Sequence, residues 1–236
     1  MTPTRRRFGP ARSNHGPALA AVLGSALILA ACTGGSGVPT VPPGSASVSA
    51  GPSAAGSAGP DTACPTAEPP VMPSGSDRLV SLDTRLGTIV ITVHGDWSPI
   101  AAANFVSLAG CGFYDGVGFH RVATLGDGSP FVIQGGDPTG SGSGGPGYTI
   151  ADEPLTVAYA RGIVAMARTN APHSEGSQFF IVLSDAAVPI LASYGTYAIF
   201  GEVTAGMDVA DAIYADADGE LPTKPVLMDD VSVTTP

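Results

Sequence analysis

The last two thirds of the chain contain many short runs in which apolar and polar residues alternate. This pattern predicts many β-strands. Residues 79–83 and 88–94 alternate on either side of Arg85-Leu86-Gly87, which is typical of a β-hairpin. The other strands are expected at residues 118–123, 131–135, 162–167, 177–183, 197–203 and 226–234.

Two segments instead repeat their apolar residues at helical spacing. The first helix is expected to begin at Ser98-Pro99, with Ser98 as N-cap, and to end at Gly110. The second is expected over residues 207–214. Many short strands with only two helices favour a closed antiparallel barrel or a sandwich, and the pattern alone does not choose between them.

Composition divides the chain into three parts. Residues 1–31 are predicted to be a signal peptide, because a basic start is followed by an apolar stretch too short to span a bilayer. Residues 32–76 are rich in Gly, Ser, Pro and Ala, lack the apolar surface needed to fold, and are predicted to form a flexible linker. Residues 77–236 have the size of a single domain.

The signal-like segment ends at Leu29-Ala30-Ala31-Cys32, which resembles the lipobox of bacterial lipoproteins. That resemblance implies cleavage before Cys32 and attachment of lipid to its thiol. An ordinary signal peptide with a chance cysteine is the alternative. The arginines at positions 5–7 also resemble a twin-arginine export signal, and the sequence leaves open which export route is used.

Cleavage would leave 6 Lys and Arg against 20 Asp and Glu, a formal net charge of −14. This acidity argues against nucleic acid as a partner. It also means that acyl chains, and not a basic patch, would hold the protein at a membrane. We therefore expect an exported monomer, anchored to the cell membrane by lipid, with its folded domain on the extracytoplasmic side.

Two further cysteines, Cys64 and Cys111, remain after the expected cleavage. Disulfides persist in the compartments that exported proteins reach. A bridge between these cysteines would fix the end of the linker to the folded domain, and two free thiols are the alternative.

Three motifs carry the candidate chemistry: Phe119-His120-Arg121-Val122, residues 131–137 (FVIQGGD) and residues 176–181 (GSQFFI). They combine one permanent cation, one amide and two aromatic rings, with no evident nucleophile, base or metal cage. The motifs resemble those of the cyclophilin family of peptidyl-prolyl cis-trans isomerases, and the resemblance covers essentially all of residues 77–236. It implies an all-β fold, a closed eight-stranded antiparallel barrel capped by two helices.

The resemblance also implies site residues. Arg121, Phe131, Gln134 and Phe180 match the catalytic set, with Arg121 as hydrogen-bond donor and the phenylalanines as walls around the proline ring. Taken singly, Arg121 is better explained by a surface ion pair, and each phenylalanine by ordinary core packing. The expected substrate-binding residues are His120, Val132, Ala167, Arg168, Thr169 and Tyr197.

Rotation about an X-Pro bond breaks no bond and needs neither cofactor nor metal. The expected substrates are proline-containing segments of unfolded or flexible exported proteins. A non-catalytic chaperone or scaffold module that binds proline peptides on the same fold is the alternative. It is favoured by residues 122–130, which form a longer link than is typical of the family and either bulge outward or partly cover the site.

The segment of residues 184–194 contains no tryptophan, whereas the family often has one after the matching strand. Because that indole helps to hold the cyclic peptide cyclosporin in the family, we expect weak inhibition of this protein. Titration of isomerase activity with cyclosporin should give a micromolar or weaker inhibition constant. Nanomolar inhibition would contradict the expectation.

Overall fold

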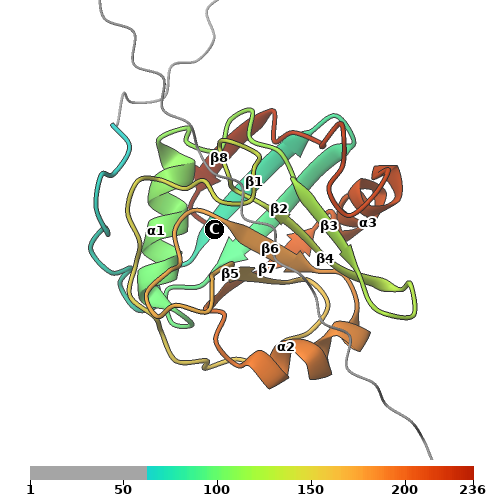
Figure 1. Cartoon of the computed structure of the whole chain (residues 1–236). Helices are drawn as coiled ribbons and strands as arrows, with labels where there is room; N and C mark the ends of the chain where they lie inside the picture. The colour runs from blue at the N-terminus through green and yellow to red at the C-terminus, as the bar shows by residue number, and fades with distance from the viewer. Residues whose placement is uncertain (1–62) are drawn as a thin grey trace, which may run out of the picture. The chain divides into compact units, whose positions relative to one another are not determined.

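The computed structural model describes residues 63–236, so the signal-like segment, Cys32 and most of the predicted linker lie outside the described residues (Figure 1). The predicted hairpin is confirmed as β1 and β2, which pair antiparallel in continuous register. The strands are β1 (Arg78–Thr84), β2 (Gly87–Val93), β3 (Arg121–Thr124), β4 (Pro130–Gly135), β5 (Ile163–Met166), β6 (Phe179–Val182), β7 (Ile199–Ala205) and β8 (Asp230–Thr234).

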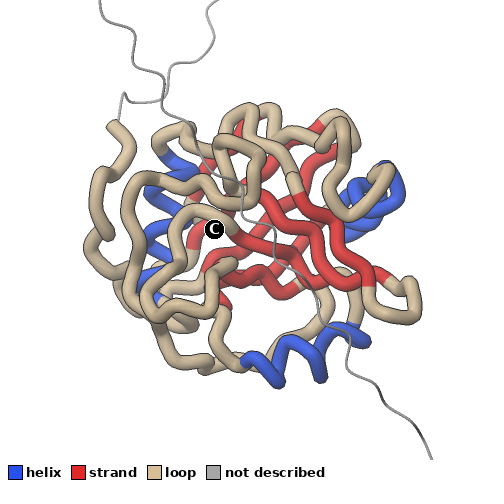
Figure 2. Tube along the Cα trace, in the orientation of Figure 1, coloured by secondary structure: helices blue, strands red, loops and turns tan. Residues whose placement is uncertain are grey.

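The eight strands form one antiparallel sheet in the order β3-β4-β6-β5-β7-β2-β1-β8, strongly curved as Figure 2 shows. The two end strands, β3 and β8, do not pair, so the expectation of a closed barrel is wrong and the fold is an open half-barrel. The residues before β8 occupy this opening with irregular backbone. Their backbone contacts with the β3 side are single hydrogen bonds and the isolated bridge Gly118↔Leu227. Pro222 and Pro225 lie in this segment and cannot donate to a ladder.

The two predicted helices are present as α1 (Pro99–Gly110) and α3 (Met207–Asp216), and Figure 1 shows them at opposite ends of the curved sheet. Both contribute residues to the main core. A third helix, α2 (Val188–Tyr194), follows a short 3₁₀ turn, so the expectation of only two helices is wrong. Its signals were Pro189 in the first turn and Gly195, which ends the helix with a φ of 59°. No helix within residues 63–236 is long and apolar enough to cross a bilayer.

Ser98 does not cap α1 with its side chain, contrary to expectation. The carboxylate of Glu153 does so instead, because its two oxygens accept the N–H groups of Ile100 and Ala101, each at 2.9 Å. A carboxylate at this end of a helix also complements the helix dipole.

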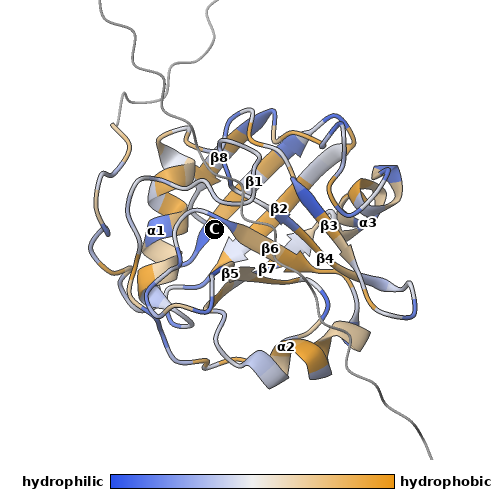
Figure 3. Ribbon diagram, viewed as in Figure 1, coloured by the Kyte–Doolittle hydropathy of each residue, from blue (hydrophilic) through white to orange (hydrophobic). Residues whose placement is uncertain are grey.

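The central strands are rich in apolar residues, as the orange colour in Figure 3 shows. Their side chains pack in two separate clusters, one on each face of the sheet. Every residue of β5 and β6 is buried, which explains why these strands lack clear alternation. One face packs in the main core with Phe105 of α1. The other face packs in a second, smaller cluster that includes Phe180 of β6 and Leu191 of α2.

Cys64 and Cys111 form a disulfide, the first of the two alternatives that the sequence allows. Other described residues before β1 also contact the domain. Met72 is buried, and its N–H donates to the carbonyl of Pro99, while Glu68 accepts the N–H of Ala151. The last part of the predicted linker is thus held along the domain at several points.

Candidate active site

The register of four strands sets four residues in one row across the sheet. Arg121 of β3 lies opposite Gln134 of β4, and Gln134 lies opposite Phe180 of β6. Phe180 in turn lies opposite Ala165 of β5. Residues directly opposite one another in an antiparallel ladder project to the same face. The fold therefore brings together three of the four predicted catalytic residues on the face of the second cluster.

Side-chain hydrogen bonds link this row to the glycine-rich segment. Arg121 Nη1 donates to Gln134 Oε1 at 3.4 Å, and Gln134 Nε2 donates to Gln178 Oε1 at 2.9 Å. Gln178 Nε2 donates to the carbonyl of Gly144 at 2.9 Å. These hydrogen bonds all run in one direction, from Arg121 through Gln134 and Gln178 to Gly144. The two glutamine amides are therefore each fixed in one orientation.

The two predicted site phenylalanines, Phe131 and Phe180, do not belong to the main core. Phe180 is a member of the second cluster, and the half-buried Phe131 and Tyr197 pack against that cluster. The rings of Phe180 and Tyr197 meet edge to face, with their centroids 5.3 Å apart. Val132 is buried in the same cluster. The result is an aromatic wall beside Arg121.

A groove of about 560 Å³ adjoins Gln134, and Arg121, Phe131 and Phe180 are not among its lining residues. It is lined by Gln134, residues 142–149, Ala167, Arg168, Thr169, Ser174 and residues 176–178. The backbone beside it is closely packed: a Cβ on Gly136, whose φ is 87°, would lie 2.3 Å from the carbonyl oxygen of Ser177. Glycine is required at this position.

The longer link after Arg121 does not line the groove. It extends the β3–β4 hairpin, closed by a bond from the N–H of Leu125 to the carbonyl of Ser129. The hydroxyl of Tyr214 in α3 donates to the carbonyl of Gly128, which holds this turn toward α3. Of the two arrangements left open by the sequence, the structure has the outward-directed one, and the link leaves this groove uncovered.

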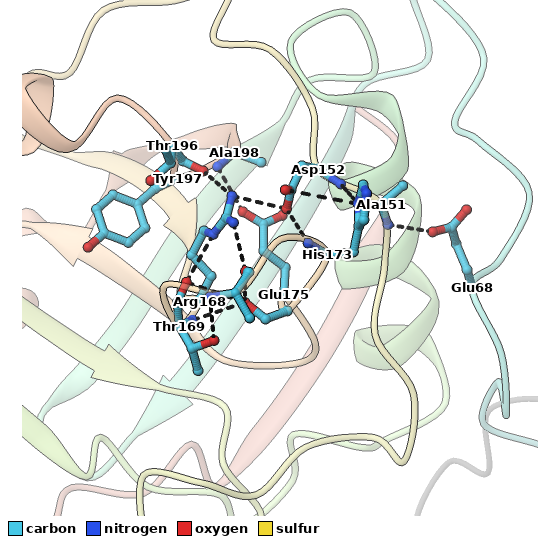
Figure 4. Close-up of polar contacts among 12 residues, drawn as sticks. Glu68, Ala151, Asp152, Arg168, Thr169, His173, Glu175, Thr196, Tyr197 and Ala198 are labelled. Atoms are coloured by element: carbon cyan, nitrogen blue, oxygen red, sulfur yellow. Dashed lines mark hydrogen bonds and ion pairs between the residues drawn. The ribbon is translucent and has the colours of Figure 1, made fainter.

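Arg168 lies in the groove wall, but its guanidinium points into the protein (Figure 4). Its side chain is 9% exposed and pairs with Asp152 at 3.0 Å. It also donates to the carbonyls of Thr169, Ala171 and Thr196. The Arg168 side chain therefore joins the wall around Thr169 to the segment that carries Tyr197.

Glu175 lies within this network and is fully buried (Figure 4). Burial raises the pKa of its carboxyl group to about 8, against an opposing effect of Arg168, while Asp152 and Glu153 raise it further. Oε1 accepts the N–H of Ala198 at 3.1 Å, whereas Oε2 has no hydrogen-bond partner among the described residues.

His120 was predicted to bind substrate, but its ring is buried and is not among the groove-lining residues. Burial lowers the pKa of its imidazole, an effect opposed by Asp137. The ring is therefore held neutral near pH 7. Residues 63–236 contain no group of three or more His, Cys, Asp or Glu side chains placed to hold a metal ion.

Two side chains that contact the row, Gln178 and Glu220, were not predicted to have a role. Gln178 lay within a quoted motif, so its position could have been noticed. Glu220 contacts Arg121 from 99 residues away, and no local sequence signal marks it. The site thus combines a permanent cation, two hydrogen-bonded glutamine amides and an aromatic wall beside a groove. Such a site is suited to twisting the amide bond of a bound peptide without breaking it.

Comparisons with known proteins agree with this description. Residues 79–233 match the family model described as cyclophilin type peptidyl-prolyl cis-trans isomerase/CLD. The chain is 40% identical over 179 residues to the probable peptidyl-prolyl cis-trans isomerase A of Mycobacterium leprae, a match covering 67% of this chain and 93% of that protein. It is 45% identical over 135 residues to peptidyl-prolyl cis-trans isomerase-like 1 of Rhizopus delemar, covering 55% and 76%.

A crystal structure of a Cryptosporidium parvum cyclophilin type peptidyl-prolyl cis-trans isomerase matches with a TM-score of 0.60 at 31% identity, covering 68% of this chain and 99% of that one. The same protein crystallised in the presence of the dipeptide Ala-Pro matches with a TM-score of 0.59. The chain belongs to the cyclophilin family and is a peptidyl-prolyl cis-trans isomerase. The non-catalytic module is therefore set aside.

The buried Glu175 predicts a dependence of stability on pH. A carboxyl group whose pKa rises from 4.5 to about 8 on folding favours the folded state only while it is protonated. Its contribution is complete below pH 4.5 and is lost as the pH rises through about 8. Between about pH 5 and pH 9, the urea midpoint of Glu175→Gln should therefore fall less than that of the wild type.

Asp230→Asn is the control, because that carboxylate is exposed and forms no ion pair with another of the described residues, so its loss should change the pH dependence little. Parallel pH curves for the wild type and Glu175→Gln would contradict a buried carboxyl group that ionises near pH 8.

Proposed function

We propose that this isomerase acts outside the cytoplasm on X-Pro bonds of exported proteins, with Arg121 as the donor that stabilises the twisted amide. The observation that carries the catalytic part is the row of Arg121, Gln134 and Phe180, which sets a cation beside an aromatic wall.

The amide bond resists rotation with a barrier of about 18–20 kcal/mol because of its partial double-bond character. In the twisted state the proline nitrogen becomes pyramidal and gains a localised lone pair. A guanidinium is suited to stabilising that state, because it is always charged and presents a rigid set of donors. Phe131, Phe180 and Tyr197 would enclose the proline ring, and Gln134 and residues 167–169 would bind the peptide backbone.

The location outside the cytoplasm is supported by two features. The Cys64–Cys111 disulfide fits an oxidising compartment. The pattern of residues 1–32, with its arginines, apolar stretch and Leu29-Ala30-Ala31-Cys32, fits export followed by lipid attachment at Cys32. Residues 33–62 would then separate the domain from the membrane.

Expression of the full chain in a bacterium, with labelled fatty acid in the medium, tests the anchor. The wild type should carry label and enter the detergent phase on phase separation, whereas Cys32→Ser should carry none. Cys111→Ser is the matched control, since it loses the disulfide but keeps the lipidation site. An unlabelled wild type in the aqueous phase would contradict the proposal.

A further inference from the structure

The guanidinium of Arg121 is held from outside the groove by one carboxylate. Nε and Nη2 of Arg121 both contact Oε1 of Glu220, at 2.9 and 2.8 Å. The remaining nitrogen, Nη1, is the one that contacts Gln134, at the longer distance of 3.4 Å. Glu220 thus makes the two short contacts to this cation and leaves Nη1 on the side of Gln134.

The backbone fixes the position of Glu220 independently of this ion pair. The N–H of Val122, the residue after Arg121, donates to the carbonyl of Glu220 at 2.8 Å. Asp218 closes the turn around Glu220 by accepting the N–H of Thr223 at 2.9 Å. The segment lies in the opening between β3 and β8, where no regular ladder forms. The opening in the sheet therefore gives an acidic side chain a fixed place beside Arg121.

We propose that Glu220 is a positioning residue for the isomerase reaction, which holds the plane of the Arg121 guanidinium and keeps Nη1 directed toward Gln134, a residue that lines the groove. The proposal rests on the proposed role of Arg121 as donor. Glu220 is not among the groove-lining residues and is assigned no contact with substrate.

Glu220 has two opposing effects on Arg121. Its charge weakens the field that Arg121 exerts on the reacting amide, but this attraction is screened because the two side chains are 37% and 60% exposed. Its two contacts also remove rotamer freedom from a long side chain that otherwise makes one long hydrogen bond. Preorganisation of a donor is worth more in the twisted state than a screened charge costs, so loss of Glu220 should slow the reaction.

The test measures cis-trans exchange of a short X-Pro peptide by NMR, over a series of peptide concentrations, with the full chain. Glu220→Ala should lower kcat roughly tenfold with little change in KM. Glu220→Gln keeps an acceptor oxygen and should recover most of that loss. The Arg121 Nε–H signal should be protected from exchange in the wild type and in Glu220→Gln, and lose this protection in Glu220→Ala.

Asp211→Ala is the matched control, because Asp211 pairs at 2.7 Å with Arg161, which is also 37% exposed, away from the groove. It should leave kcat unchanged. A kcat in Glu220→Ala equal to or above that of the wild type would overturn the positioning role, as would a loss that Glu220→Gln does not recover. Wild-type activity in Arg121→Ala would instead overturn the proposed role of Arg121 itself.

Discussion

The antiparallel register of β3, β4 and β6 is the constraint on which the site depends. Because Arg121, Gln134 and Phe180 lie directly opposite one another, one cation, one amide and one ring share a face without any loop having to place them. A shift of one residue in either pairing would turn one of these side chains to the other face. The precision of the site therefore comes from the ladders, and the loops add the groove beside it.

The sheet packs against an apolar layer on each of its two faces. Its inner face packs against α1 in the main core, which leaves the outer face of β4, β5 and β6 free to carry a second cluster. The aromatic wall is the partly uncovered edge of that cluster, so the surface that would receive a proline ring is continuous with packed interior. Arg168 and Glu175 hold the neighbouring segments together through buried polar contacts (Figure 4). Rigid walls of this kind suit a reaction in which the bound amide must twist and the site must not.

Local pattern was sufficient to predict the hairpin, α1, α3 and most strands, because alternation and helical spacing follow directly from which face is buried. The grouping of Arg121, Gln134 and Phe180 came from motifs and not from periodicity. The opening between β3 and β8 was missed, because strand count alone does not reveal whether end strands meet. Glu220 could not be found either, since its contact arises from main-chain pairing with Val122 between distant segments. The capping of α1 by Glu153 was missed because this side chain lies 53 residues from Ile100 along the sequence.

The central claim is that Arg121 stabilises the twisted amide. The most direct test measures cis-trans exchange in a short X-Pro peptide with the full-length wild type and with Arg121→Ala, while circular dichroism monitors the fold. The wild type should accelerate exchange, and the variant should be slower by roughly a hundredfold while remaining folded, since it loses a charged donor that acts mainly in the twisted state. Equal acceleration by a folded Arg121→Ala variant would contradict the account.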